Sequence, residues 1–237
     1  MLILGIDCSE KTCSAALLLD GEIIGSTTLN SGLTHSENLI PLINGLTELT
    51  GKSCGEIDLY AVAAGPGSFT GVRIGVSTVK GLAFAGSTPC IGLSSLLCMA
   101  YGFTGRETVV CPVMDARRGQ VYGALFGVSG DTVRRLTPDA ALPAEELAGL
   151  IPRECGGKNV IVCGGGAGIM LEACRGMKNV LPAPPELIFE SGASVALAAL
   201  DALRSGAETF PGGDGLRPVY LRPSQAERKK TEREAKS

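Results

Sequence analysis

Apolar and polar positions divide the chain into short predicted elements. Continuous apolar runs predict buried strands, and apolar residues spaced three or four apart predict helices. A turn signal at Asp20-Gly21 joins two of the strands as a hairpin. In residues 1–105 these patterns predict, in order, strands at 2–7, 12–19 and 22–29, a helix at 36–50, a strand at 57–64, a helix at 69–85, a strand at 89–92 and a helix at 94–101.

After a polar, glycine-containing break at residues 102–107, the order of elements repeats in a thinner form. The second series predicts strands at 109–114, 120–128 and 132–136, a helix at 144–150, a strand at 160–163, and helices at 168–175 and 195–203. Two copies of the order β-β-β-α-β-α predict a duplicated α/β architecture with domains at 1–105 and 106–222. Residues 223–237 lack apolar periodicity, and we expect a disordered tail.

Composition narrows the classes of function. The net charge of −3 predicts no nucleic-acid footprint, and no apolar run approaches the length of a membrane span. The nine cysteines form no CxxC pair and mostly lie in apolar runs, which is typical of buried residues in a reducing cytoplasm. With His35 as the only histidine, we expect no zinc or iron site and no Ser-His-Asp triad.

The first candidate site follows the first predicted strand. Asp7 and Ser9 stand where a carboxylate and a hydroxyl could meet a phosphate-bound Mg²⁺, and Thr12 follows shortly after. The alternative is that Asp7 accepts hydrogen bonds from turn amides.

Two glycine-rich turns precede predicted helices. In residues 65–75, exposed backbone N–H groups could bind an anion. Alternatively, Ser68 or Thr70 caps the helix while Gly71 and Gly75 let another backbone approach. The turn at Gly164, Gly165 and Gly166 could accept the adenosine side of a nucleotide, although neither turn carries a phosphate-binding lysine.

Two further features have both a functional and a structural interpretation. Arg117 and Arg118 occupy a predicted hairpin tip, where they could contact a phosphate or carboxylate in a cleft or simply be solvated. His35 lies beside Ser36 at a predicted helix start, which is more typical of a capping or surface residue than of a catalyst.

The element order resembles the actin/Hsp70/sugar-kinase superfamily, whose domains are ribonuclease H-like. Within it, the segments at residues 5–7, 65–75 and 114–122 resemble the TsaB (YeaZ) family of tRNA threonylcarbamoyladenosine biosynthesis proteins. The similarity is strong over residues 1–125 and holds only in outline over 126–222.

The resemblance implies a partner protein rather than an independent activity. Members of this family bind the enzyme TsaD and the ATPase TsaE, and the TsaD enzyme holds its metal through a His-x-x-x-His pair. Here His35 is followed four positions later by Leu39, so the pair is broken. We therefore expect a non-catalytic cytoplasmic scaffold without an intrinsic cofactor. It would form a homodimer when alone and contact tRNA only through the complex, with no membrane contact.

Two enzymatic alternatives are weaker. An ATP-dependent small-molecule kinase of the same superfamily would place Asp7 on Mg²⁺ and residues 164–168 on adenosine, but no clear general base accompanies them. The glycoprotease activity sometimes attributed to this group lacks both a metal pair and a triad. For the scaffold, we expect only a weak ATP or ADP site, at the complex interface.

The helices predicted at residues 38–49 and 69–85 carry more apolar residues than one buried stripe requires. Such a face is either deep in a core or presented to a partner. The resemblance favours a partner, and Gly71 and Gly75 would let its helix approach closely. Charged residues at Ile43 and Val76 should then prevent association without unfolding the chain. The expected contacts are Leu39, Ile40, Ile43, Leu46, Val72, Gly75, Val76 and Val79.

Overall fold

The computed structural model describes residues 1–222. Its first sheet has the strand order β3-β2-β1-β4-β5. The β1–β2–β3 meander is antiparallel, and β4 and β5 extend it in parallel with β1. Asp20 and Gly21 adopt positive φ at the predicted hairpin turn. The strands are β1 (Leu2–Asp7), β2 (Cys13–Leu19), β3 (Glu22–Leu29), β4 (Leu59–Gly65) and β5 (Cys90–Ser94).

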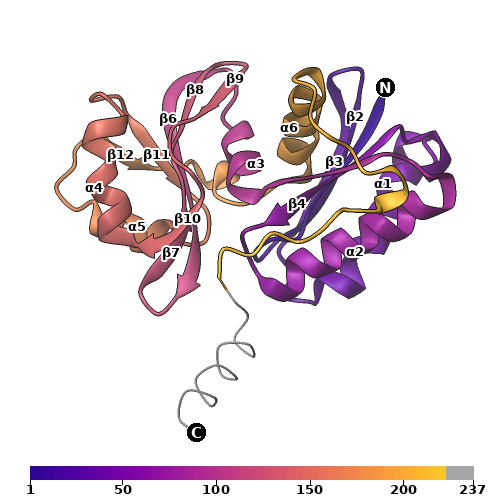
Figure 1. The fold of residues 1–237 in the computed structure, drawn as a ribbon, viewed down its shortest axis with the longest axis horizontal. Coiled ribbons are helices and arrows are strands. Elements are labelled where there is room, and N and C mark those ends of the chain that lie inside the picture. The colour runs from indigo at the N-terminus through magenta and orange to yellow at the C-terminus, as the bar shows by residue number, and fades with distance from the viewer. Residues whose placement is uncertain (223–237) are drawn as a thin grey trace, which may run out of the picture.

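Helices cover both faces of this sheet. α1 (His35–Thr50) and α2 (Phe69–Gly86) pack on one face, and α3 (Ser95–Tyr101) and α6 (Gly192–Arg204) pack on the other (Figure 1). A short 3₁₀ helix, η1 (Cys54–Glu56), precedes β4. Strand alternation explains the division, because Leu2, Leu4 and Ile6 face the α1–α2 core while Ile3 faces α6.

The first helix begins earlier than the sequence predicted. Thr34 is its N-cap, and Thr34 and Glu37 form a capping box, so the helix includes His35 and Ser36. Pro41 lies inside the helix, which continues to Thr50 and ends at Gly51 in the left-handed conformation.

The second sheet has seven strands and is built around the 12-residue strand β6. The first half of β6 pairs with β8 and the second half with β7. The single strand predicted at 120–128 is therefore two strands. This sheet comprises β6 (Arg106–Arg117), β7 (Gln120–Gly123), β8 (Phe126–Gly130), β9 (Thr132–Arg135), β10 (Ala140–Pro143), β11 (Val160–Cys163) and β12 (Val180–Pro182), with helices α4 (Ala144–Glu154) and α5 (Ala167–Ala173) and the 3₁₀ helix η2 (Pro185–Leu187).

The expected second domain at 106–222 needs correction at its end. The boundary at 105 and 106 coincides with the start of β6, but α6 returns to the first sheet, as Figure 1 shows. Gly5 permits this packing, because a Cβ there would lie 2.2 Å from the Gly192 carbonyl oxygen. The following segment also returns, with η3 (Pro211–Gly213) on α2 and the Val219 N–H donating to the Ala64 carbonyl. The predicted tail at 223–237 lies outside the described residues.

Within residues 1–222, no helix combines the length and apolarity needed to cross a membrane.

Candidate functional site

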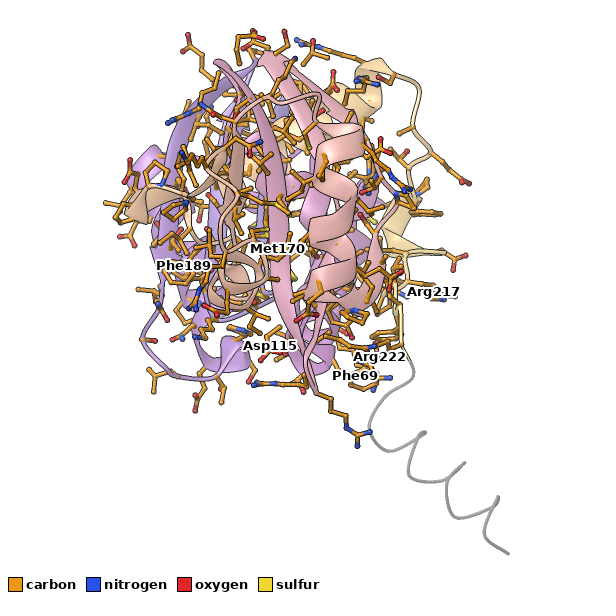
Figure 2. The ribbon with its side chains drawn as sticks, turned by 90° about the vertical axis from the view of Figure 1, so that its left-hand side faces the viewer. Phe69, Asp115, Met170, Phe189, Arg217 and Arg222 are labelled. Atoms are coloured by element: carbon orange, nitrogen blue, oxygen red, sulfur yellow. The ribbon has the colours of Figure 1, made fainter. Side chains whose placement is uncertain are left out.

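The chain forms two units, each built on one of the two sheets. A cavity of about 470 Å³ lies between these two units. The first unit contributes Glu10 and the start of α2, and the second contributes the β6–β7 hairpin and Gly165. The C-terminal segment at residues 219–222 completes the wall. In Figure 2, Phe69, Asp115 and Arg222 gather at the same end of the molecule. Segments that are far apart in sequence therefore form one cleft.

Asp7 is fully buried at the end of β1, three residues before Glu10 of the cleft wall, and does not itself line the cavity. Its Oδ1 accepts hydrogen bonds from the Ser9 N–H at 2.8 Å and the Ser9 hydroxyl at 2.6 Å. Oδ2 has no hydrogen-bond partner among residues 1–222. Burial and then the nearby Glu190 carboxyl raise the pKa of Asp7 to about 7. Asp7 therefore stabilises the turn through one carboxyl oxygen, while the other is buried without a partner in the described residues.

Two glutamates complete an acidic group that the sequence did not predict. Glu190 is buried, and its Oε1 accepts the Thr12 N–H at 2.9 Å. The Glu10 Oε2 accepts the Gly165 N–H at 2.8 Å, and burial followed by the charge of Glu190 raises the pKa of Glu10 to about 7. Because Thr12 and Glu190 are 178 residues apart, only the fold reveals this group.

The glycine turn before α5 is occupied from within the chain. The Gly165 N–H binds Glu10, and a Cβ at this glycine would lie 2.3 Å from the Glu10 Oε1. The Gly166 N–H donates to the Val113 carbonyl. The Gly165 N–H, which a bound anion would need, is therefore already hydrogen-bonded to Glu10. This opposes tight nucleotide binding at Gly164, Gly165 and Gly166.

The turn before α2 has mainly a packing role. Ser68 is the N-cap and accepts the Gly71 N–H at 3.3 Å. A Cβ at Gly71 would lie 2.0 Å from the Cys8 carbonyl oxygen, and one at Gly75 would lie 3.2 Å from Val62. The expectation that these glycines admit a partner helix is wrong, because the space is filled by the chain's own β1–β2 turn and sheet.

The two arginines lie at the tip of the β6–β7 hairpin, both with positive φ. Arg117 lines the cavity and forms an ion pair of 3.1 Å with Asp115. Arg118 is exposed and does not line the cavity. The geometry therefore leaves Arg117 as a cleft contact and gives Arg118 the solvated position.

An aromatic contact that the sequence did not predict holds the C-terminal segment over the cleft. The rings of Phe69 and Tyr220 stack with centroids 4.8 Å apart. Arg73 lies over Phe69 at 3.8 Å, and its Nε donates to the Tyr220 hydroxyl at 2.7 Å.

The expected exposure of the helix faces is largely wrong. On α1 and α2, seven of the eight named residues are buried because they pack against the sheet and each other, namely Leu39, Ile43, Leu46, Val72, Gly75, Val76 and Val79. Ile40 alone is exposed, at 43%. The apolar side chains that these helices leave in solvent are Ile40, Leu49 and Phe84.

The buried carboxyls predict an unusual dependence of stability on pH. The folded chain retains protons on Asp7 and Glu10 up to about pH 7, above the ordinary values of 3.8 and 4.5. Their contribution to the free energy of unfolding is therefore complete at low pH and lost as the pH rises toward 7. For Asp7 the loss is on the order of 4 kcal/mol.

Urea denaturation between pH 4.5 and about 7.5 measures this dependence. Asp7→Asn should reduce it to the smaller part that Glu10 contributes, whereas Asp131→Asn, at an exposed loop position, should leave it unchanged. Stability that rises over this range in the unmodified chain would contradict the prediction.

Comparisons with known proteins agree with the architecture. The family model described as "TsaD: tRNA N6-adenosine threonylcarbamoyltransferase" matches residues 30–228. The tRNA threonylcarbamoyladenosine biosynthesis protein TsaB of Escherichia coli is 30% identical over 236 residues, which cover 97% of this chain and 98% of that protein. The TsaB protein of Bacillus subtilis is 29% identical, with 97% of each chain covered.

A solved structure extends the comparison to the fold. YeaZ from Pseudomonas aeruginosa is 29% identical, with a TM-score of 0.80 over 93% of this chain and 99% of that one. The predicted two-domain α/β fold is thereby confirmed.

Proposed function

The chain belongs to the TsaB (YeaZ) family of tRNA threonylcarbamoyladenosine biosynthesis proteins, and we propose that within this pathway it is a non-catalytic scaffold for a TsaD-type enzyme. A TsaE-type ATPase would join the same assembly, and tRNA would be contacted only through it. In the absence of the enzyme the chain would pair with a second copy of itself in the cytoplasm.

The broken metal pair carries this proposal. A TsaD-type metal site needs two histidines one helical turn apart, and here the second position is Leu39, which is 1% exposed and packs in the core under α1. With one histidine in the whole sequence, the chain cannot supply that pair. A transferase partner would then provide the chemistry, while this chain provides a binding surface.

Docking through the exposed sides of α1 and α2 is consistent with their surface. Ile40, Leu49 and Phe84 are 43%, 88% and 80% exposed, which is unusual for large apolar side chains on two adjacent helices. We therefore propose that Ile40, Leu49 and Phe84 contact the partner enzyme, in place of the buried helix residues that the sequence suggested.

A kinase remains the second candidate because Asp7 keeps a buried carboxyl oxygen without a hydrogen-bond partner among residues 1–222. Glu10 on Gly165 opposes it, since a nucleotide phosphate would meet a carboxylate there. We therefore expect ATP or ADP to bind this chain weakly, and any tighter site to involve the partner.

Co-purification with the TsaD homologue of the same organism tests the proposal. We expect a stable complex, no turnover of ATP with sugars or small acids by the isolated chain, and loss of threonylcarbamoyladenosine from tRNA when the chain is depleted. ATP-dependent phosphorylation by the isolated chain would instead support the kinase. Failure to bind the homologue while the tRNA modification persists without the chain would reject the scaffold.

A further inference from the structure

Cys8 and Cys13 meet at the turn end of the β1–β2 hairpin. Asp7 and Ser14 are the last paired residues of the two strands, so these cysteines are the next residue on each side. Both side chains are 1% exposed, and their Sγ atoms are 3.7 Å apart. Two Zn–S bonds of about 2.3 Å at a tetrahedral angle place two sulfurs about 3.8 Å apart. The hairpin thus holds the thiols at the spacing of two thiolates on one metal ion.

His35, the first residue of α1, adds a nitrogen ligand to this pair. One of its ring nitrogens and the two sulfurs all lie within 4.8 Å of one another. Nε2 is 2.9 Å from the Glu10 carbonyl oxygen, whereas Nδ1 is buried without a hydrogen-bond partner among residues 1–222. A metal-binding histidine commonly donates its other ring N–H to a carbonyl, which fixes the ring and the tautomer. The Glu10 carbonyl therefore orients Nδ1 as the ligand atom.

The surroundings favour a compact cation at this place. Gly71 approaches so closely that a Cβ there would lie 3.1 Å from the His35 ring and 2.0 Å from the Cys8 carbonyl, so the ligands are held by backbone packing. The carboxyl of Glu190 lies nearby. In the described part of the chain, this is the one group of three such side chains with converging ligand atoms.

We propose that Cys8, Cys13 and His35 bind one Zn²⁺ ion through two thiolates and a neutral imidazole, with water in the fourth position. Two thiolates balance the charge of the ion, and binding releases the two thiol protons. The ion would connect the hairpin end to the start of α1, across the exposed residues 30–34. The sequence predicted no zinc site because its cysteines are scattered along the chain. In the fold, however, Cys8 and Cys13 lie together and converge with His35.

Metal reconstitution of the full chain tests the site directly. The protein is purified without a tag, reduced, treated with a chelator and handled without oxygen. Titration with Zn²⁺ against a chromophoric chelator should give one ion per chain with sub-micromolar affinity. Co²⁺ should give the thiolate charge-transfer and tetrahedral absorption bands of a cysteine-containing site, and excess Zn²⁺ should remove them.

Matched variants assign the ligands. Cys8→Ala, Cys13→Ala and His35→Gln should each weaken Zn²⁺ binding by at least about 100-fold, since loss of an orienting partner alone costs 10–100-fold. Cys98→Ala, at another fully buried cysteine, should bind as the unmodified chain does. Less than a tenth of an equivalent of Zn²⁺ in the reduced unmodified chain would overturn the proposal. Unchanged binding by Cys8→Ala would also overturn it, and the cobalt spectrum of the unmodified chain decides the matter if a variant does not fold.

Discussion

Gly71→Ala is expected to lower the free energy of unfolding by about 3 kcal/mol or more. The new Cβ would lie 2.0 Å from the carbonyl oxygen of Cys8. That oxygen belongs to backbone at the end of β1, a strand in which all six residues are buried, so neither it nor α2 can move freely. Urea denaturation measures the change, and we expect a fall in the midpoint with little change in slope.

Gly81→Ala is the matched control for this substitution. Gly81 lies in the same helix, is exposed, and has no atom within 4 Å of its Cβ position. Alanine has a higher helix propensity than glycine, so this variant should gain about 0.5–1 kcal/mol. The same glycine-to-alanine change is therefore expected to lower the free energy of unfolding at position 71 and to raise it at position 81. A gain of stability in both variants would show that α2 does not pack on the Cys8–Ser9 turn.

The first unit could be predicted well because its signals are local. Six consecutive buried residues form β1, and the Asp20-Gly21 dipeptide selects the turn between β2 and β3. The short strands β10 and β12 were missed because they have four and three residues and are defined by their pairing partners. Hydrophobic periodicity cannot identify such strands, since they contain too few residues to show a period.

The position of α6 shows a second limit of the sequence. Its apolar spacing predicts a helix, but only the fold shows that it packs on β1 rather than on the second sheet. Gly5, Gly192 and Ala196 meet at this contact. Small residues four positions apart in the helix are a signal of close packing, yet they do not say which strand is approached.

The candidate site could be predicted only in part, because the sequence shows local patterns but not contacts between distant residues. Asp7 and the glycine turns could be found because each is a local pattern at the end of a strand. Glu190 and the pairing of Cys8 with His35 depend on contacts across 178 and 27 residues, respectively. The widened apolar faces of α1 and α2 were assigned to a partner, whereas the sheet beneath them accounts for most of their area.

Val76→Glu and Ile40→Glu are expected to have opposite effects on the fold. Val76 is 2% exposed in the core between α2 and the sheet, so a carboxylate there should cost about 3–5 kcal/mol and leave much of the protein unfolded or insoluble. Ile40 is 43% exposed on α1, and its replacement should change stability by less than about 0.5 kcal/mol.

If the scaffold proposal holds, Ile40→Glu should still weaken binding to the TsaD homologue by at least about 10-fold, because it places a charge in an apolar contact. Leu181→Glu provides the matched control, since Leu181 is 44% exposed on β12 of the other unit and should bind normally. Circular dichroism and urea denaturation report the fold, and calorimetry reports the affinity. Normal binding by a folded Ile40→Glu variant would place the docking surface away from the exposed side of α1. A folded Val76→Glu variant that fails to bind would instead restore the original assignment of Val76 to the interface, because a residue in the core cannot accept a charge while the sheet and helix remain packed.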